Sequence, residues 1–412
     1  MTNLSDVILK GLILTGGQFQ RMNPLASFYP KTMLQVQGKP ILGHVIDALI
    51  STGVFHIVVV IGQSDLFSSV IQYLRSGKFG ENVKIDIITQ KEPGVRGAIL
   101  SAKNEFKNEG KVFLAHGDIV ATKSFYQHLS NTVQRTGADG GVAMTLKSSI
   151  EDFGVCQLDS TGNIDKVIEH PGQGSDVGNY IGAGAYIFPN KFFETLSESS
   201  DFDKAINNLI KTGYRLAGSI FSDENKWMDI GTPYDLLSAN HIFFSEYAGT
   251  IIHSTAKISP SAQLIGPVKI ESGVTIEHGS IIKGPVYIGK NVYIGTNTLI
   301  RDNTSIEENC RIGFSVEIKN THIQPNTKVG RLSFLGDSVV GMNVNINSGV
   351  TIMNHIPESQ PEFIVRGTNF DHKIGSILGD HCIIGANAVL EPITKIGYKE
   401  IIPPGVVIST PL

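Results

Sequence analysis

The sequence predicts two domains of different fold class, a doubly wound α/β domain over residues 1–250 and a parallel β-helix over residues 251–412. Two observations carry this prediction. Strand and helix patterns alternate between residues 11 and 115, and a hydrophobic residue recurs at every sixth position from Ile258 to Ile318. A period of six matches neither the helical period of 3.6 nor the strand alternation of two. It indicates a solenoid in which each hexad forms one flat side of a triangular coil.

The six-residue repeat predicts ladders of inward-pointing side chains in the β-helix. The repeated positions are Ile258, Leu264, Ile270, Ile276, Ile282, Ile288, Ile294, Ile300, Ile306, Ile312 and Ile318. Similar spacing returns at Val340, Ile346 and Ile352, and again from Ile384 to Ile408. The stretch 354–372 breaks the repeat, so we expect a loop that projects from the coil.

The N-terminal part has the alternating pattern of a doubly wound sheet. We expect strands at 11–15, 55–62, 83–89 and 111–115, helices at 40–52, 64–76 and 96–108, a β-rich stretch at 141–187 and a helix at 232–248. Ligands of such sheets bind outside the carboxyl ends of the strands. The loops 15–24 and 116–121 each follow a strand, so we expect both at that edge.

Composition excludes several classes of partner. The net charge of −4 gives no reason to expect binding to nucleic acid or to an anionic membrane. The sequence has no apolar run long enough for a transmembrane helix, and the first residues lack the features of a signal peptide. Three widely spaced cysteines suit a reducing compartment. We therefore expect a cytoplasmic protein.

The loop after the first strand has residue types that suit phosphate binding. Gly16 and Gly17 follow the strand directly, Arg21 comes four positions later, and Lys31 follows Pro30. Glycine lets backbone N–H groups approach a phosphate closely, and the two cations supply fixed positive charge. The pattern favours a nucleoside triphosphate, although a short glycine motif is also compatible with an ordinary turn.

Two isolated carboxylates strengthen this interpretation. Asp118 follows the strand at 111–115, and Asp229 precedes the turn at Gly231. Two carboxylates beside a triphosphate are the usual ligands of magnesium in phosphoryl transfer. The sequence therefore predicts a Mg²⁺ site at Asp118 and Asp229.

Residues 11–42 resemble the signature of the sugar-1-phosphate nucleotidylyltransferases, L-A-x-G-x-G-T-R-L-x-P-L-T-x-x-x-P-K-x-x-L-P-V-x-G-K-P. The resemblance continues through Gln90, Gly117-Asp118, 153–155, 168–171, 182–186 and 227–231. Segments 317–320, 332–338 and 373–380 are similar to the β-helix of archaeal-type bifunctional sugar-1-phosphate nucleotidylyltransferase/acetyltransferases. The resemblance implies a Rossmann-like nucleotidyltransferase domain followed by a left-handed parallel β-helix.

The resemblance also implies a role for individual residues. Arg21, Lys31 and Asp118 would be catalytic, and Asp118 and Asp229 would hold the metal. The nucleotide would be bound by Gly16, Gly17, Gln90, Gly97 and Gly117, and the sugar phosphate by Gly154, Glu169, His170 and Asn179. The substrates would be a nucleoside triphosphate and a sugar 1-phosphate, and the products a nucleotide sugar and pyrophosphate.

The chain departs from the family pattern at several positions. Phe19 replaces the second glycine of the phosphate loop, Arg96 lies in the base-reading segment, and His170 replaces a lysine that meets the sugar phosphate. In the acetyltransferase half, Arg331 and Phe334 stand where the family has a histidine base and a tyrosine. Arginine cannot accept a proton at neutral pH, so we expect no amino-sugar acetylation.

Three hypotheses follow. The first is an active nucleotidylyltransferase whose β-helix is structural and forms a homo-oligomer, by analogy a trimer. The second is a catalytically weak or inactive regulatory homologue that binds a nucleotide sugar, which the departures favour and the retained magnesium carboxylates oppose. The third, a pure hexapeptide acyltransferase, is opposed by the missing base. The sequence does not identify the sugar or the base.

Overall fold

The structure, a computed structural model, describes residues 9–16, 20–107, 110–147, 150, 153–169, 171, 177–223, 226–356 and 373–409. The chain forms two compact units that interleave in sequence. The α/β unit comprises Met1–Gln18 and Ile41–Met228, and the β-helix unit comprises Phe19–Pro40 and Asp229–Leu412. The segment Phe19–Pro40 therefore belongs to the same unit as the β-helix. The domain boundary expected near residue 250 stays a prediction.

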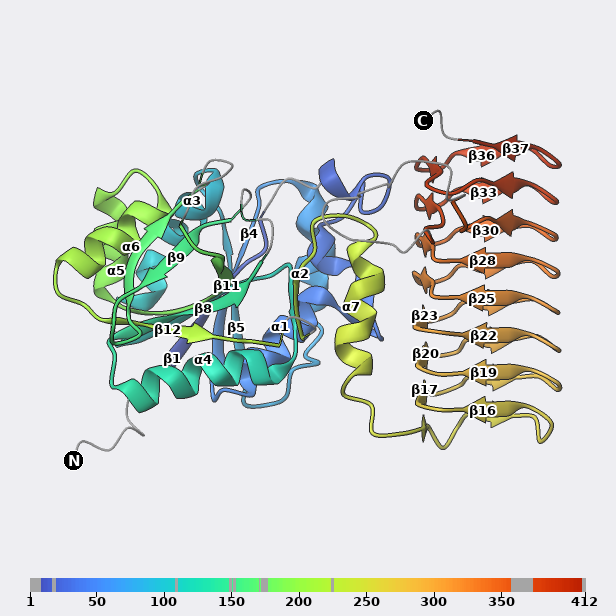
Figure 1. Ribbon diagram of the computed structural model, residues 1–412, viewed down its shortest axis with the longest axis horizontal. Helices are drawn as coiled ribbons and strands as arrows, with labels where there is room; N and C mark the ends of the chain where they lie inside the picture. The colour runs from blue at the N-terminus through green and yellow to red at the C-terminus, as the bar shows by residue number, and fades with distance from the viewer. Residues whose placement is uncertain are drawn as a thin grey trace. The chain divides into compact units, whose positions relative to one another are not determined.

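A mixed sheet of nine strands forms the centre of the α/β unit (Figure 1). Its parallel part has the order β5-β4-β1-β6. These strands are β1 (Leu9–Leu14), β4 (His56–Ile61), β5 (Lys84–Thr89) and β6 (Lys111–His116). They are the four strands expected from the sequence. Valine and isoleucine dominate β4, which is buried between two neighbours, as in other parallel sheets.

An antiparallel extension, in which β12 pairs parallel with β8, follows β6 in the sheet. It consists of β8 (Gly140–Leu146), β9 (Val155–Leu158), β10 (Ile164–Ile168), β11 (Tyr180–Pro189) and β12 (Leu216–Ile220). β11 pairs antiparallel with β6, β8 and β9, and β10 closes this edge against β9. This extension accounts for the β-rich stretch expected at 141–187.

Helices cover both faces of the sheet, as in a doubly wound fold (Figure 1). They are α1 (Ile41–Ile50), α2 (Ser68–Leu74), α3 (Gly94–Ser101), α4 (Lys123–Thr136), α5 (Lys191–Glu198) and α6 (Phe202–Lys211). Side chains of α3, α5 and α6 share one buried cluster with Leu12, Val58 and Leu114, while α4 contacts α1, β8, β11 and β12. The helix expected at 96–108 instead begins at Gly94 and ends at Ser101, because a 3₁₀ turn (Lys103–Phe106) carries Phe106 into this cluster.

The β-helix consists of three parallel sheets of eight strands, which we call its first, second and third faces. The first face contains β14 (Ile251–Ile252), β17 (Val268–Ile270), β20 (Val286–Ile288), β23 (Thr304–Ile306), β26 (His322–Ile323), β29 (Val339–Val340), β32 (Ile377–Leu378) and β35 (Lys395–Ile396). The second contains β15 (Lys257–Ile258), β18 (Thr275–Ile276), β21 (Tyr293–Ile294), β24 (Arg311–Ile312), β27 (Lys328–Val329), β30 (Asn345–Ile346), β33 (Ile383–Ile384) and β36 (Ile401–Ile402). The third contains β16 (Gln263–Ile265), β19 (Ile281–Lys283), β22 (Leu299–Arg301), β25 (Glu317–Lys319), β28 (Phe334–Gly336), β31 (Thr351–Ile352), β34 (Val389–Leu390) and β37 (Val407–Ile408).

The stacked inward side chains form one continuous apolar core, as the six-residue repeat predicts. Ile276, Ile294 and Ile312 lie directly above one another on the second face and are 1% exposed or less. The repeat shortens by one residue in the middle of the stack, where Ile318 pairs with Leu335. After Ile352 of β31 the coil resumes at Ile377 of β32, and the stretch between them contains the loop expected at 354–372, of which 357–372 lie outside the described residues.

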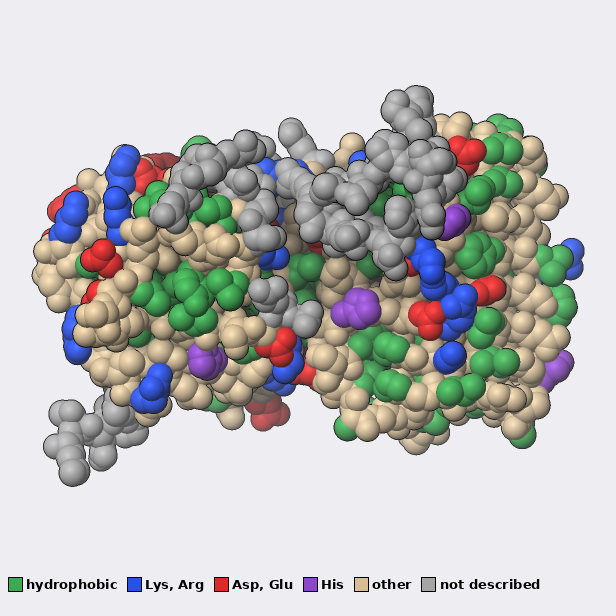
Figure 2. Space-filling view, viewed as in Figure 1, with side chains coloured by type: hydrophobic (Ala, Val, Ile, Leu, Met, Phe, Trp, Pro, Cys, Tyr) green, Lys and Arg blue, Asp and Glu red, His purple; other side chains and the backbone are tan. Residues whose placement is uncertain are grey.

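The outward side chains distinguish the three faces. Those of the first face are buried from Tyr287 through Ser305, His322 and Val339 to Ile377. Their cover includes α7 (Asp235–Phe244), which corresponds to the helix expected at 232–248 and contacts β23 and β26. The outward side chains of the second face are exposed or half-buried. On the side of the β-helix that Figure 2 shows, charged side chains gather among apolar ones, and third-face ion pairs include Arg301–Glu317 at 2.8 Å.

A buried glutamate of the first face binds a hairpin from the N-terminal signature. β2 (Gln35–Val36) and β3 (Lys39–Pro40) form a hairpin whose two loop residues, Gln37 and Gly38, both have positive φ. The Glu307 carboxylate accepts the N–H of Gln37 at 2.8 Å and that of Gly38 at 2.8 Å. A Cβ at Gly38 would lie 2.2 Å from the Tyr287 hydroxyl, so only glycine fits this loop.

Burial sets the ionisation of Glu307. The side chain is fully buried, and this burial raises the pKa of its carboxyl to about 7, against the lowering effect of the Gly38 N–H, the Ser305 hydroxyl and the Gln37 N–H. The negative charge of Glu308 raises it further. Tyr247 and Tyr287, which also face Glu307, have pKa values raised by burial and remain neutral near pH 7.

No helix among the residues that the structure describes is long and apolar enough to cross a lipid bilayer.

Replacement of Leu332 by asparagine is expected to stabilise the protein. Leu332 occupies a left-handed corner at φ 59° and is 61% exposed, and the equivalent corners of neighbouring coils carry Asn297, Gly349 and Asn387. Leucine is strained in this conformation, whereas asparagine tolerates it. Leu332→Asn should raise the free energy of unfolding by about 1 kcal/mol in denaturant titrations. Asn326→Gly, at a corner already occupied by a tolerant residue, serves as the control and should change stability less; a destabilised Leu332→Asn variant would contradict the strain argument.

Glu307 should also make stability depend on pH. Its folded pKa of about 7 lies above its ordinary value of 4.5, so its contribution is fully present below pH 4.5 and is lost as the pH rises through 7. The wild type should therefore lose up to about 3 kcal/mol between pH 5 and pH 8 that Glu307→Gln does not lose. Denaturant midpoints of both proteins at the two pH values measure this difference; parallel pH curves would refute it.

Candidate active site

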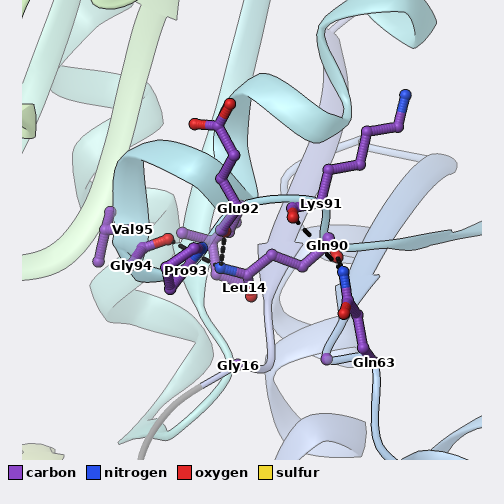
Figure 3. Close-up of a pocket in the computed structure, with 11 residues that line it drawn as sticks. Leu14, Gly16, Gln63, Gln90, Lys91, Glu92, Pro93, Gly94 and Val95 are labelled. Atoms are coloured by element: carbon purple, nitrogen blue, oxygen red, sulfur yellow. Dashed lines mark hydrogen bonds between the residues drawn. The ribbon is translucent and has the colours of Figure 1, made fainter.

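A pocket of about 520 Å³ opens at the carboxyl ends of β1, β4 and β5 in the α/β unit (Figure 3). Its lining residues are Leu14, Gly16, Gly62, Gln63, Gln90, Lys91, Glu92, Pro93, Gly94, Val95 and Ala98. The volume is typical of a site for a small molecule. Gly16 and Gln90, both expected to bind a nucleotide, lie in this one pocket, while Gly17 lies outside the described residues.

The amide of Gln90 has a fixed orientation. Its Nε2 donates to the carbonyl oxygens of Glu92 at 2.6 Å and Gly94 at 2.9 Å, and its backbone N–H donates to Ile61 at 2.8 Å. A Cβ at Gly16 would lie 2.7 Å from Oε1 of Gln90, so the amide oxygen faces Gly16 (Figure 3). Gln90 can therefore offer an acceptor oxygen to the N–H group of a ligand, while both of its N–H groups hold the loop.

The two other glycines expected at the nucleotide have structural roles. A Cβ at Gly97 would lie 2.2 Å from the Glu92 carbonyl oxygen, so glycine lets the pocket loop fold onto α3. A Cβ at Gly117 would lie 2.9 Å from the Leu14 carbonyl oxygen, which accepts the Gly117 N–H at 2.8 Å. Neither residue lines the pocket. Both glycines shape the loops that border it.

Arg96 does not line the pocket, although it lies in the segment expected to read the base. Its Nε donates to the carbonyl oxygen of Ser199 at 2.8 Å, and one terminal nitrogen donates to that of Ser197 at 3.1 Å. A guanidinium at these carbonyl oxygens caps the carboxyl end of α5, where positive charge is favourable. Arg96, one of the departures counted in favour of a regulatory role, therefore stabilises a helix end.

Asp118 lies at the carboxyl edge of the sheet, as expected. It follows β6 and precedes β7 (Ile119–Ala121), which pairs with β13 (Trp227–Asp229). The buried side chain of Tyr126, on α4, is close enough to Asp118 to be influenced by its charge. Burial raises the pKa of Tyr126, and the charge of Asp118 raises it further. The pairing of β7 with β13 depends on tertiary structure and could not be inferred from the spacing of these residues.

Three of the residues expected at the sugar phosphate, Gly154, Glu169 and Asn179, lie at one end of the antiparallel extension. Val155 pairs with Ile168 of β10 and with Ile181 of β11. Gly154 and Glu169, which flank these positions, therefore lie at the same end of neighbouring strands. Asn179 is exposed two residues before Ile181, and His170 lies outside the described residues.

Asp203, which the sequence interpretation did not include, borders the same end. A Cβ at Gly154 would lie 3.2 Å from Oδ2 of Asp203, at the start of α6. Burial raises the pKa of the neighbouring Cys156 to about 12, and the charge of Asp203 raises it further. Two carboxylates, Glu169 and Asp203, can therefore accept hydrogen bonds from hydroxyl groups here. No spacing in the sequence connects residue 203 to residue 154.

Three of the expected phosphate and metal residues belong to the β-helix unit. Arg21 is exposed in a 3₁₀ turn (Gln20–Met22), and Lys31 begins another (Lys31–Met33). The Lys31 ammonium donates to the carbonyl oxygen of Ile230 at 2.7 Å. Ile230 directly follows Asp229 in the sequence. Asp235 holds this turn by accepting the N–H groups of Gly231 and Thr232 at 2.8 and 2.5 Å.

The donor set suits a magnesium ion, but it is small. Asp118 and Asp229 supply carboxylate oxygens, the ligands that Mg²⁺ prefers, and Mg²⁺ commonly uses one or two carboxylates together with substrate phosphates. Among the residues that the structure describes, no group of three or more histidine, cysteine, aspartate or glutamate side chains could hold a metal ion. Each of the two carboxylates is therefore of the kind that can bind a metal together with a triphosphate.

The β-helix positions that resemble an acetyltransferase site have no general base among them. Arg331 lies at an exposed corner, and the Phe334 ring lies against Gly336, where an added Cβ would be 3.0 Å from its Cζ and 2.6 Å from the Asn354 amide nitrogen. That amide nitrogen also donates to the buried carboxylate of Asp337. His355 pairs with Lys373 in an isolated bridge, and His372 lies outside the described residues.

Comparisons with known proteins agree with this geometry. The profile of the family described as Nucleotidyl transferase matches residues 10–245, and the one described as GMPPB C-terminal domain matches residues 282–404. The chain is 37% identical over 405 residues to the "Bifunctional protein GlmU" of Methanococcus maripaludis strain C7, with 96% of this chain and 93% of that protein covered.

Two further comparisons extend the likeness. The chain is 30% identical to the "Bifunctional sugar-1-phosphate nucleotidylyltransferase/acetyltransferase" of Sulfurisphaera tokodaii, with 97% of each chain covered. A crystal structure of UDP-glucose pyrophosphorylase complexed with UDP-glucose aligns with a TM-score of 0.51 and 20% identity, covering 58% of this chain and 99% of that one. The latter likeness concerns the fold alone.

Removal of Arg96 is expected to affect stability more than nucleotide binding. Arg96→Ala deletes the cap of α5 and should lower the free energy of unfolding by about 2 kcal/mol. The KM for the nucleoside triphosphate should change little, because the guanidinium does not line the pocket. Arg135→Ala, which removes an exposed arginine near the end of α4, is the control. A large rise in KM with unchanged stability would place Arg96 in the nucleotide site.

Proposed function

The chain belongs to the Nucleotidyl transferase family, and on this premise we propose that it is a sugar-1-phosphate nucleotidylyltransferase. It joins a sugar 1-phosphate to a nucleoside triphosphate and releases pyrophosphate. The observation that carries this proposal is the pocket at the carboxyl edge of the sheet, where Gly16 and Gln90 of the family pattern face each other. Full-length similarity to bifunctional relatives supports the reaction type.

The reaction is an in-line displacement at phosphorus. A phosphate oxygen of the sugar 1-phosphate attacks the α-phosphorus of the triphosphate, the bond from this phosphorus to the bridging oxygen breaks, and pyrophosphate leaves with those electrons. No nucleophile from the protein is required, so catalysis consists of positioning and charge stabilisation. Arg21 binds the triphosphate, and Lys31 stabilises negative charge at the reacting phosphate.

We assign the nucleotide to the pocket of the α/β unit. Gly16 and Gly17 allow the backbone to approach the phosphates, and Gln90 offers its amide oxygen to the base. Gly97 and Gly117 act on the nucleotide through the loops that they shape.

We assign the sugar phosphate to the end of the sheet around Gly154. Glu169 and Asp203 accept hydrogen bonds from sugar hydroxyl groups, while Asn179 and His170 complete the site. The close approach of Asp203 to Gly154 supports its inclusion. The charge of Glu169 reaches Lys204, whose pKa is raised first by its hydrogen bond to Asp201 and also by Glu169.

Magnesium is the proposed cofactor, held by Asp118 and Asp229. Bound there with the triphosphate, it would neutralise charge on the phosphate oxygens. The chemistry of the two carboxylates supports this assignment.

The β-helix is proposed to lack acetyltransferase activity and to mediate homo-oligomerisation, by analogy as a trimer. Arg331 supports the first part, since arginine cannot serve as a general base.

A pyrophosphate-release assay tests the proposed function. The protein is incubated with Mg²⁺, each common nucleoside triphosphate and a panel of sugar 1-phosphates. We expect release with at least one pair. No release with any pair would reject the proposal, and consumption of acetyl-CoA with glucosamine 1-phosphate would overturn the proposed loss of acetyltransferase activity.

Asp118→Asn should reduce pyrophosphate release by several orders of magnitude, because it removes a negative ligand of the metal. Asp165→Asn is the matched control, since Asp165 is exposed on β10 and has no proposed role. Full activity of the Asp118→Asn protein would refute the metal role, and so would a loss of the same size in both variants.

A further inference from the structure

We propose that the β-helix positions the catalytic cation Lys31, because three of its side chains clamp the backbone of the signature segment on either side of this residue. The inference rests on the proposed function. It assigns positioning roles to Glu307, Gln324 and Asp380, which the family resemblance places in the β-helix half of the chain.

The clamp has two elements, and the first is the set of hydrogen bonds from Glu307 and Gln324 to the hairpin at 35–40. Glu307 accepts both loop N–H groups, as described above. One coil further on, Gln324 accepts the Gln35 N–H at 3.1 Å and donates to the Gln35 carbonyl oxygen at 2.9 Å. Such contacts to N–H and carbonyl groups fix the path of the backbone whatever its side chains are.

The second element lies higher on the same stack of coils. Asp380 accepts the Ala26 N–H at 3.2 Å and the Tyr29 hydroxyl at 3.4 Å, and it is also bonded to the Met342 N–H at 2.8 Å. The residue is 2% exposed. At the neighbouring Gly379 an added Cβ would lie 2.9 Å from the Cβ of Pro24, so glycine lets the segment approach the coil.

The two elements bracket Lys31 in the sequence. Asp380 holds the chain at Ala26 and Tyr29, before Lys31, and Glu307 and Gln324 hold it between Gln35 and Gly38, after Lys31. The Lys31 ammonium is bonded in addition to the Ile230 carbonyl oxygen of the same unit. A short segment fixed at both ends holds the cation between them in place.

A second layer of polar contacts keeps the clamp rigid. His322 is fully buried, and burial lowers its pKa to about 4, so its ring is neutral. Its Nε2 accepts from Gln324 at 2.7 Å, and its Nδ1 lies 3.2 Å from the Asn240 amide oxygen of α7. The Tyr247 hydroxyl donates to the Gln37 side-chain oxygen at 2.6 Å. Buried hydrogen bonds of this kind favour one arrangement, since breaking them leaves the polar groups of Gln324 and His322 unpaired.

The test compares three carboxylate-to-amide variants in the pyrophosphate assay. Glu307→Gln and Asp380→Asn weaken the clamp and should lower kcat roughly tenfold or more, because small displacements of catalytic groups are costly. Asp337→Asn is the matched control. Asp337 is also buried in the β-helix, at 5% exposure, but its bonding partners Asn320, Asn354 and Lys319 all belong to the coil. Asp337→Asn should keep the wild-type kcat even where its melting temperature falls as far as that of Glu307→Gln or Asp380→Asn.

A double-mutant cycle separates positioning from general destabilisation. Lys31→Arg retains a positive charge and so a measurable rate. If Glu307 acts through Lys31, Glu307→Gln should cost less in this background than in the wild type. Equal costs in both backgrounds, or a kcat loss no larger than that of Asp337→Asn, would overturn the inference.

Three further outcomes are also decisive. If Asp380→Asn does not fold, Tyr29→Phe replaces it, because this variant removes a single contact to Asp380. Tyr29→Phe should lower kcat more than Asp337→Asn does, while its melting temperature falls no further than that of Asp337→Asn. A wild-type protein that releases no pyrophosphate with any substrate pair rejects the proposed function and the clamp with it. An active wild type with unaffected clamp variants rejects the clamp alone.

Discussion

Each coil of a parallel β-helix stacks directly on the coil before it, so every outward position is repeated along a face. A face must therefore either tolerate water along its length or be covered. The first face carries Tyr287, His322 and Ile377 as outward residues, all buried. Its cover includes α7, which contacts β23 and β26, and the loop at Gly38, which approaches the Tyr287 hydroxyl. The packing of the segment that contains Arg21 and Lys31 onto the β-helix is consistent with this requirement.

Covering the first face brings polar groups into a dry interior, where each needs a partner. Glu307, Gln324 and Asp380 meet this need largely with backbone groups of the segment. Buried charge is costly, and burial raises the pKa of both carboxyl groups. A carboxylate retained in such a place is more useful as an anchor for the backbone than as a source of stability.

The α/β unit applies a different constraint. Parallel strands end at one edge of the sheet, so the loops after β1, β5 and β6 meet there whatever their separation in sequence. This edge collects Gly16, Gln90 and Asp118, and the antiparallel strands beyond β6 add the Gly154 end. The proposed reaction needs no nucleophile from the protein, because it depends mainly on charged groups held in fixed positions. A sheet edge that gathers loops from several strands can supply such groups.

The sequence by itself determined both fold classes, the four parallel strands and the inward ladders of the β-helix, because these depend on periodic burial that is visible in local spacing. The family resemblance also named Gly16 and Gln90, which the structure places in one pocket. Only the tertiary structure decided that Arg96 caps α5, that Asp203 borders Gly154 and that Glu307 holds the hairpin at Gly38. Each of these contacts joins residues far apart in the chain, and no local pattern encodes which distant groups a buried polar atom will meet.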